Sequence, residues 1–294
     1  MKKWLKRLPL LGVAALLVGG IFFLTGFAIT GFDMQALSNI QIEQKTYTES
    51  EENTITTLSL DFDTTDIRLV FDNGLTGVEV DYPQKQTKRG KNINAVTFTE
   101  TENALTVTEK ETFHPSIFTF ASPTLTLRLP TSRAYDLTIK TSTGDIVIPQ
   151  GNFTSLALET STGDISLTGV QANGVKMKAS TGDISMNNVT VASALLIETT
   201  TGSVKASQTI TAETLSIKTG TGSIKARNGV INATTIHLST STGDITATFV
   251  GRYEDYAVSV KTSTGDSNIH TNTSNAARAL TLKTSTGDIR IYFA

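Results

Sequence analysis

Aspartate recurs at a regular interval along the chain and is the residue most able to build a repeated metal site. It follows a Thr-Gly pair in six of eight places. These weak candidate ligands are Asp145, Asp164, Asp183, Asp244, Asp266 and Asp288. Calcium prefers several carboxylate and carbonyl oxygens, but each repeat offers a single Asp. We therefore favour a structural role, in which each Asp accepts hydrogen bonds from backbone N–H groups at a turn, and we expect no metal or cofactor.

Threonine precedes the glycine in all eight pairs, and in most of them another threonine lies two residues further upstream. We call these the corner threonine and the upstream threonine. The predicted structural corners are Thr143-Gly144, Thr162-Gly163, Thr181-Gly182, Thr201-Gly202, Thr221-Gly222, Thr242-Gly243, Thr264-Gly265 and Thr286-Gly287. Such T-x-T arrays resemble the ice-binding faces of threonine-rich β-solenoid antifreeze proteins, which point outward. Both threonines share parity with the apolar residues before the glycine, so we expect them to face inward and keep ice binding as a remote alternative.

Residues that could support catalysis are scarce. The only histidines are His114, His237 and His270, and no motif pairs one of them with a nucleophile. His237 lies between two apolar residues, which predicts an exposed position on a strand. The glycines are evenly spaced and form no phosphate-binding cluster. We therefore predict a non-enzyme without catalytic residues, and a carbohydrate-active or metal-dependent enzyme on a β-helix is the alternative.

The Thr-Gly pairs are 19 to 22 residues apart, a period typical of a solenoid. Apolar residues alternate with polar ones on both sides of each glycine, as Leu156 and Leu158 do before Gly163, and Ile165 and Leu167 after it. This alternation indicates half-buried strands, and its change of parity at the glycine predicts a bend there. Each unit is thus predicted to be a strand, a corner, a second strand and a short variable loop, stacked in parallel register on the next unit.

These repeats predict an all-β fold, a parallel β-solenoid (β-helix) of about 20-residue coils with an irregular N-terminal β cap. Eight regular coils are expected over residues 134–292, and the irregular part over 54–133. Within the latter, residues 58–69 match the repeat with Thr65 at the glycine position, which indicates a degenerate first coil. Threonine occupies 51 of 294 positions, in keeping with strands, and the absence of cysteine excludes disulfides and thiolate metal sites.

The N-terminal sequence predicts one transmembrane helix. Residues 8–32 carry no charge over 25 positions, long enough to cross a bilayer, and we favour a retained signal anchor over a cleaved signal. The basic segment 1–7 is expected to stay in the cytoplasm. Residues 33–53 are then a polar stalk, and residues 54–294 an extracellular domain in a single-pass cell-membrane protein.

Charge further limits the partners that we expect. The basic segment 1–7 holds four of the 25 basic residues, so residues 33–294 carry 21 basic and 27 acidic side chains, a net charge of -6. A nucleic-acid binder would show a basic face, so we expect no nucleic acid. Besides the membrane itself, the expected partners are cell-wall or other envelope components, or another membrane protein.

The repeated unit L-x-I-K-T-S-T-G-D-I-x-I, seen here from Leu280 to Ile291, resembles the bacterial putative-adhesin domain family of unknown function. The resemblance covers residues 54–294, most clearly 134–292. It implies a β-solenoid at the bacterial surface, and it supplies no catalytic residues. Membrane-anchored, LiaG-like members occur in cell-envelope-stress operons, so the resemblance implies an adhesin-like binding or scaffolding module with a link to envelope stress.

Overall fold

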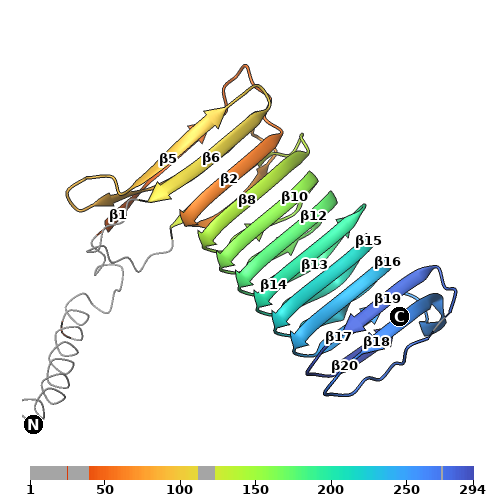
Figure 1. Ribbon diagram of the computed structural model, residues 1–294. Coiled ribbons are helices and arrows are strands. Elements are labelled where there is room, and N and C mark those ends of the chain that lie inside the picture. Colours follow the sequence, from red (N-terminus) through yellow and green to blue (C-terminus); the bar gives the residue numbers. More distant parts are fainter. Residues whose placement is uncertain (1–24, 26–39, 112–122, 273) are drawn as a thin grey trace, which may run out of the picture.

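The described part of the chain is built almost entirely of strands (Figure 1). In this computed structural model it comprises residues 25, 40–111, 123–272 and 274–294. The strands are β1 (Ile40–Thr48), β2 (Thr57–Thr64), β3 (Asp66–Asp72), β4 (Glu79–Thr87), β5 (Asn94–Glu100), β6 (Ala104–Glu111), β7 (Thr124–Pro130), β8 (Tyr135–Thr143), β9 (Ile146–Ile148), β10 (Gly151–Thr162), β11 (Ile165–Thr168), β12 (Val170–Thr181), β13 (Ile184–Val191), β14 (Ala194–Thr201), β15 (Val204–Thr221), β16 (Ile224–Thr242), β17 (Ile245–Phe249), β18 (Tyr256–Lys261), β19 (Arg278–Lys283) and β20 (Ile289–Phe293), with the short 3-10 helix η2 (Tyr253–Asp255) between β17 and β18.

The repeats stack as parallel coils, as predicted. We name each coil by its corner glycine. Equivalent residues lie opposite one another, so Leu156 on β10 pairs with Leu137 on β8 and with Val175 on β12. The same register continues through β14, β15 and β16. Parallel in-register strands place every side chain beside its equivalent about 4.8 Å away, so the outward residues form columns along the stack.

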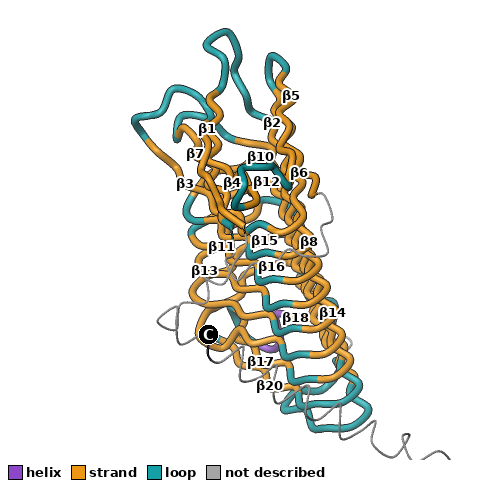
Figure 2. Tube along the Cα trace, turned by 90° about the vertical axis from the view of Figure 1, so that its left-hand side faces the viewer, coloured by secondary structure: helices purple, strands orange, loops and turns teal. Residues whose placement is uncertain are grey.

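The central coils contain three sheet-forming segments instead of the predicted two. The first face lies before the corner glycine (β8, β14), and the second face lies directly after it (β9, β11); Figure 2 shows β8 and β14 on one side of the stack and β11 and β13 on the other. A third face follows where a short loop was expected, with Val189 paired to Ile210 and Ile210 to Ile231. It begins at a second corner, where Asn188 and Gln208 have positive φ.

The order of the last two repeats in space is the reverse of their order in the sequence. β16 of the Gly243 coil pairs with β19 of the Gly287 coil, and β19 pairs in turn with β18 of the Gly265 coil. The last two coils are therefore not stacked in sequence order, because the C-terminal strands insert between two earlier ones. The same reversal occurs at the other end, where β2 and β3 lie between the β6–β7 segment and the β8–β9 coil.

The exposed edge of the Gly265 coil is covered by side chains of the segment that follows it. Asn272 accepts a hydrogen bond from the Val258 amide (2.9 Å) and donates its own amide to the Val258 carbonyl (2.9 Å). The Thr271 hydroxyl accepts from the amide of Val260 (3.0 Å). Covering an edge strand in this way removes the unpaired groups on which another strand would add.

The N-terminal cap is antiparallel and extends further than predicted. β5 pairs with β6, β4 pairs with β7, and β1 pairs with β4, all antiparallel. Residues 40–48, assigned above to a polar stalk, are therefore part of the folded domain. The predicted degenerate coil is present, with β2 and β3 stacked on β8 and β9.

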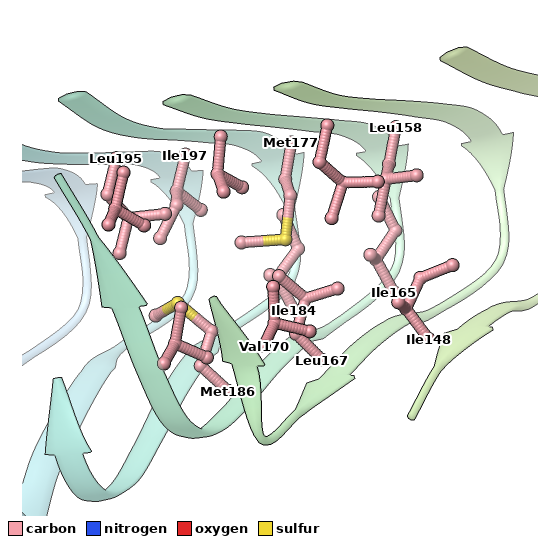
Figure 3. Close-up of a cluster of buried hydrophobic side chains, with 14 of the residues drawn as sticks. Ile148, Leu158, Ile165, Leu167, Val170, Met177, Ile184, Met186, Leu195 and Ile197 are labelled. Atoms are coloured by element: carbon pink, nitrogen blue, oxygen red, sulfur yellow. The ribbon is translucent and has the colours of Figure 1, made fainter. Parts of the chain in front are cut away.

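A continuous apolar core fills the stack. Figure 3 shows Leu158, Met177 and Ile197 of the first face pointing toward Ile165 and Ile184 of the second. The apolar positions on both sides of the corner are buried in successive coils, as their alternation predicts. This core holds the outward columns on a rigid support.

The predicted anchor at 8–32 lies outside the described residues, apart from Thr25. Among the residues that the structure describes, none belongs to a helix long and apolar enough to cross a membrane.

Candidate functional site: corners and the adjoining groove

The corner glycine is required by the close approach of successive coils. Gly202 has φ +152, and a Cβ atom there would lie 1.9 Å from the Gly182 carbonyl oxygen. Its amide donates to the carbonyl of Thr221 in the next coil (2.9 Å). Only glycine permits this backbone conformation and contact together. Thr65 can replace glycine in the first coil because its backbone does not have the positive φ of the corner glycines, and its hydroxyl donates to Glu109 of the cap (3.1 Å).

The upstream threonines face inward, as predicted, and bond one coil to the next. The Thr219 hydroxyl donates to the Gly202 carbonyl (2.8 Å), and Thr240 donates to Gly222 (2.9 Å). The other upstream threonines that donate to a glycine carbonyl are Thr160, Thr199, Thr262 and Thr284. In the Gly182 coil an alanine, Ala179, occupies the position.

The corner threonines face solvent, which contradicts the inward orientation expected for them. Thr143, Thr162 and the equivalent residues up to Thr286 are exposed. The bend occupies several residues, so the chain leaves the inward-outward alternation after the upstream threonine. Because the corner and upstream threonines point in opposite directions, they do not form the outward double array that an ice-binding face requires.

The corner aspartates cap the next coil. An Asp164 carboxylate oxygen accepts the backbone amide of Asp183 (2.7 Å), and Asp145 accepts that of Asp164 (2.8 Å). The column continues from Asp244 to Asp288 and from Asp288 to Asp266. In the described part of the chain, no three acidic or histidine side chains gather closely enough to hold a metal ion. The aspartates therefore act on backbone amides, the structural role favoured from the sequence.

Two adjacent coils replace this aspartate with serine. Ser203 accepts the amide of Ser223, and Ser223 accepts that of Asp244, each at 3.2 Å. These bonds are longer than those made by the aspartates, and a neutral hydroxyl is a weaker acceptor than a carboxylate. The exchange keeps the hydrogen bond and removes two negative charges from the middle of the column.

A surface groove crosses the second face beside these serines. It encloses about 640 Å³ and extends from the Gly163 coil to the Gly243 coil. Its lining combines small polar residues such as Ser166, Ser185 and Asn187 with three cations, Lys205, Lys225 and Arg227. We call these three the groove cations. The sequence analysis did not identify them, although each lies three or five residues after a corner glycine, at an outward position.

The groove cations differ in how far they are neutralised. Lys205 forms an ion pair with Asp183 (2.7 Å), which holds the pKa of Asp183 below its usual range and raises that of Lys205. Lys225 is exposed and forms no ion pair with any described residue. The guanidinium carbon of Arg227 lies over the Tyr292 ring, 4.7 Å from its centre, and the guanidinium forms no ion pair with any described residue. Two cations therefore keep most of their capacity to bind an anion.

His237 is exposed on its strand, as predicted. His270 donates no side-chain contact to the groove and instead offers its carbonyl to the Tyr253 hydroxyl (2.7 Å). The third histidine, His114, lies outside the described residues. The structure thus brings neither described histidine to the corner column or the groove.

Buried charges hold the cap to the first coils, and the sequence analysis missed them. Arg133 donates to both Glu49 carboxylate oxygens (2.9 Å each), and Glu49 also accepts the amides of Ile55 (2.7 Å) and Val78 (2.5 Å). Lys85 is buried against Glu109 (3.1 Å). These polar residues lack a periodic pattern, so their burial has no signal in the sequence.

Comparison with known protein families identifies the family of the chain. The model of the Toastrack DUF4097 family matches residues 55–292, most of the length. The chain belongs to this Toastrack family. No curated protein matches the chain.

Several solved structures are similar to the chain at low identity. A putative adhesin from Bacteroides fragilis is 12% identical over 85% of this chain and 97% of its own, with a TM-score of 0.47. A putative adhesin from Parabacteroides distasonis is 11% identical over 86% of this chain and 94% of its own, with a TM-score of 0.45. A putative cell adhesion protein from Clostridium sporogenes is 9% identical over 86% of this chain and all of its own, with a TM-score of 0.32.

Proposed function

We propose that this Toastrack protein is a non-catalytic, adhesin-like binding module of the bacterial cell envelope, held at the membrane by residues 8–32 with its β domain outside the cell. The observation that carries the proposal is the groove of the second face, where polar and cationic side chains face outward from a rigid stack. The corner groups, by contrast, are engaged in bonds between coils. A surface of this kind suits recognition of an extended partner.

Location at the envelope is supported by the charge pattern of the N-terminus. A span of 25 uncharged residues after four basic ones fits a single anchor with the C-terminal domain outside. The resemblance to LiaG-like proteins adds a link to envelope stress. The partner would then be a wall or other envelope component, or a second membrane protein.

Location is tested with the full chain expressed in bacterial cells. External protease should degrade the β domain in intact cells while a cytoplasmic marker survives. Protection of the domain in intact cells, with degradation only after lysis, would exclude an extracellular position.

Binding is tested with the full chain purified in detergent micelles. It should co-sediment with insoluble cell-wall sacculi, whereas an unrelated single-pass protein of similar net charge should stay in solution. If neither sacculi nor detergent-solubilised membrane proteins retain it, the binding function is wrong.

A further inference from the structure

Two departures from the repeat coincide at the same coils. The corner aspartate is replaced by serine only in the Gly202 and Gly222 coils, and these coils also carry the three groove cations. The serine caps are longer than the aspartate caps, so their advantage is not tighter stacking. What the exchange does change is the charge beside the groove.

The placement of Lys225 shows the effect of that exchange. Asp183 at one corner pairs with Lys205 on the next coil. The residue that stands in the same relation to Lys225 is Ser203, because Lys205 and Lys225 are paired in register. An aspartate at position 203 would therefore neutralise Lys225, and serine leaves this lysine free.

Placing the groove cations next to one another does not stabilise the stack. Like charges on directly opposite strand positions repel each other, yet Lys205 and Lys225 occupy such positions, with Arg227 two residues further along the same strand. Among the residues that the structure describes, a carboxylate forms an ion pair with Lys205 but with neither of the other two cations. Residues 33–294, whose net charge is -6, thus maintain a local cluster of three cations.

We propose that the groove binds a linear, polyhydroxylated polyanion, namely a glycan or polyol chain with phosphodiester or carboxylate groups. Lys225 and Arg227 would bind the anionic groups, while Ser185, Asn187 and Ser207 would hydrogen-bond the hydroxyls. Five coils at about 4.8 Å spacing make the groove roughly 19 Å long, which fits an extended chain. This inference rests on the proposed binding function and specifies its ligand.

The test measures binding of the full chain in detergent micelles to four soluble polymers. Poly(glycerol phosphate) presents phosphodiesters, alginate presents carboxylates, dextran is neutral, and a DNA duplex is a polyanion without free hydroxyl groups along its chain. We expect binding to the first or the second, weakening as salt is raised, and little binding to dextran or DNA. Which of the two polymers binds more tightly identifies the anionic group.

Charge variants assign the binding to the groove. The double substitution Lys225→Gln and Arg227→Gln should lower the affinity about five- to thirtyfold, as expected for the loss of two exposed charge contacts. The matched control is Lys261→Gln with Lys283→Gln, which changes the net charge equally at exposed positions of the first face. The control should bind like the natural protein.

A second variant separates binding from stability. Ser203→Asp with Ser223→Asp restores the acidic column, so it should leave thermal stability unchanged or higher while reducing polymer binding at least about fivefold. Equal affinity of the natural protein, the glutamine variant and the aspartate variant would overturn the groove assignment. Equal binding of DNA would also overturn it, because the interaction would then be charge alone. Retention on sacculi together with absence of binding to all four polymers would refute this inference while leaving the proposed function intact.

Discussion

The missing hydroxyl at Ala179 offers a direct measure of what the upstream threonines contribute. Ala179 is buried and lies in register between Thr160 and Thr199. Both neighbours donate to the glycine carbonyl of the preceding coil at 3.1 Å. The equivalent acceptor for residue 179 is the carbonyl of Gly163. The substitution Ala179→Thr should supply the absent donor.

The expected gain follows from the hydrogen bond that is formed. An intramolecular hydrogen bond contributes about 0.5–1.5 kcal/mol net, and the carbonyl it satisfies is at present without a threonine donor. Threonine occupies the same place in both flanking coils. We expect about 1 kcal/mol of additional stability, which corresponds to a rise in Tm of about 2–4 °C for a domain of this size.

The assay is thermal and urea unfolding of the full chain in detergent micelles, followed by far-UV circular dichroism. Ala179→Val is the matched control, because valine has the shape of threonine without the hydroxyl. Thr219→Val is the reverse change and should cost about 1–3 kcal/mol by leaving the Gly202 carbonyl unpaired. If valine at 179 stabilises as much as threonine does, packing and not the hydrogen bond explains the column, and the reasoning is refuted.

Three further predictions concern the corner, the cap and acid pH. Gly202→Ala should lower the free energy of unfolding by more than about 2 kcal/mol in urea melts, because the new Cβ overlaps a backbone carbonyl; a neutral effect would contradict the tight stacking. Glu49→Gln should cost about 3 kcal/mol in the same melts, since it removes a buried carboxylate that pairs with the half-buried Arg133, and a loss under about 1 kcal/mol would count against this clamp. The depressed pKa of Asp183 means that its stabilising contribution is present above about pH 4 and is lost as pH falls below that value; an NMR titration should show this pKa return toward its usual range in Lys205→Gln, and an unchanged pKa would exclude the ion pair as its cause.

The local periodicity of the repeats was enough to predict the coils but not their corners. Apolar residues two and four positions after Gly163 and five and seven before it are buried, because alternation directly reports which side of a strand faces the core. The alternation does not indicate the residue at which the strand ends and the bend begins. Ser161 and Thr162 are both exposed at the bend, so parity alone assigned the corner threonine to the wrong side.

The sequence contains an alternating apolar pattern for the third face, but the unequal spacing of the corner glycines obscures it. Val189 and Val191, Ile210 and Ala212 alternate in the same way as the other strands and are buried. Because the distance between glycines varies from 19 to 22 residues, these pairs do not align when the units are superimposed on the glycine. Superimposing Val189 on Ile210, as the strand pairing does, brings both pairs into register, and this needs a one-residue shift that the glycine alignment does not contain.

The reversed order of the last coils could not be derived from the repeat, because the Gly265 and Gly287 units carry the same corner motif. One residue does mark the difference. Ser267 occupies the position after the corner that is apolar in every other unit, as in Ile289. A coil with a polar residue at this position gives up less apolar burial when it lies at the end of the stack. Its second face there is joined to the neighbouring coil by the single bridge between Ser267 and Ile289.

The residue after the corner glycine has two separate effects. Its side chain caps the amide of the next coil, and its charge sets the potential of the adjoining second face. Aspartate and serine both satisfy the first requirement, so the second can vary from coil to coil without a change of backbone. The groove cations follow the two serine corners, and the parallel pairing sets Lys205 directly opposite Lys225. A repeat that tolerates a neutral cap therefore allows Lys225 to lie beside a corner without a carboxylate partner while the coils stay stacked.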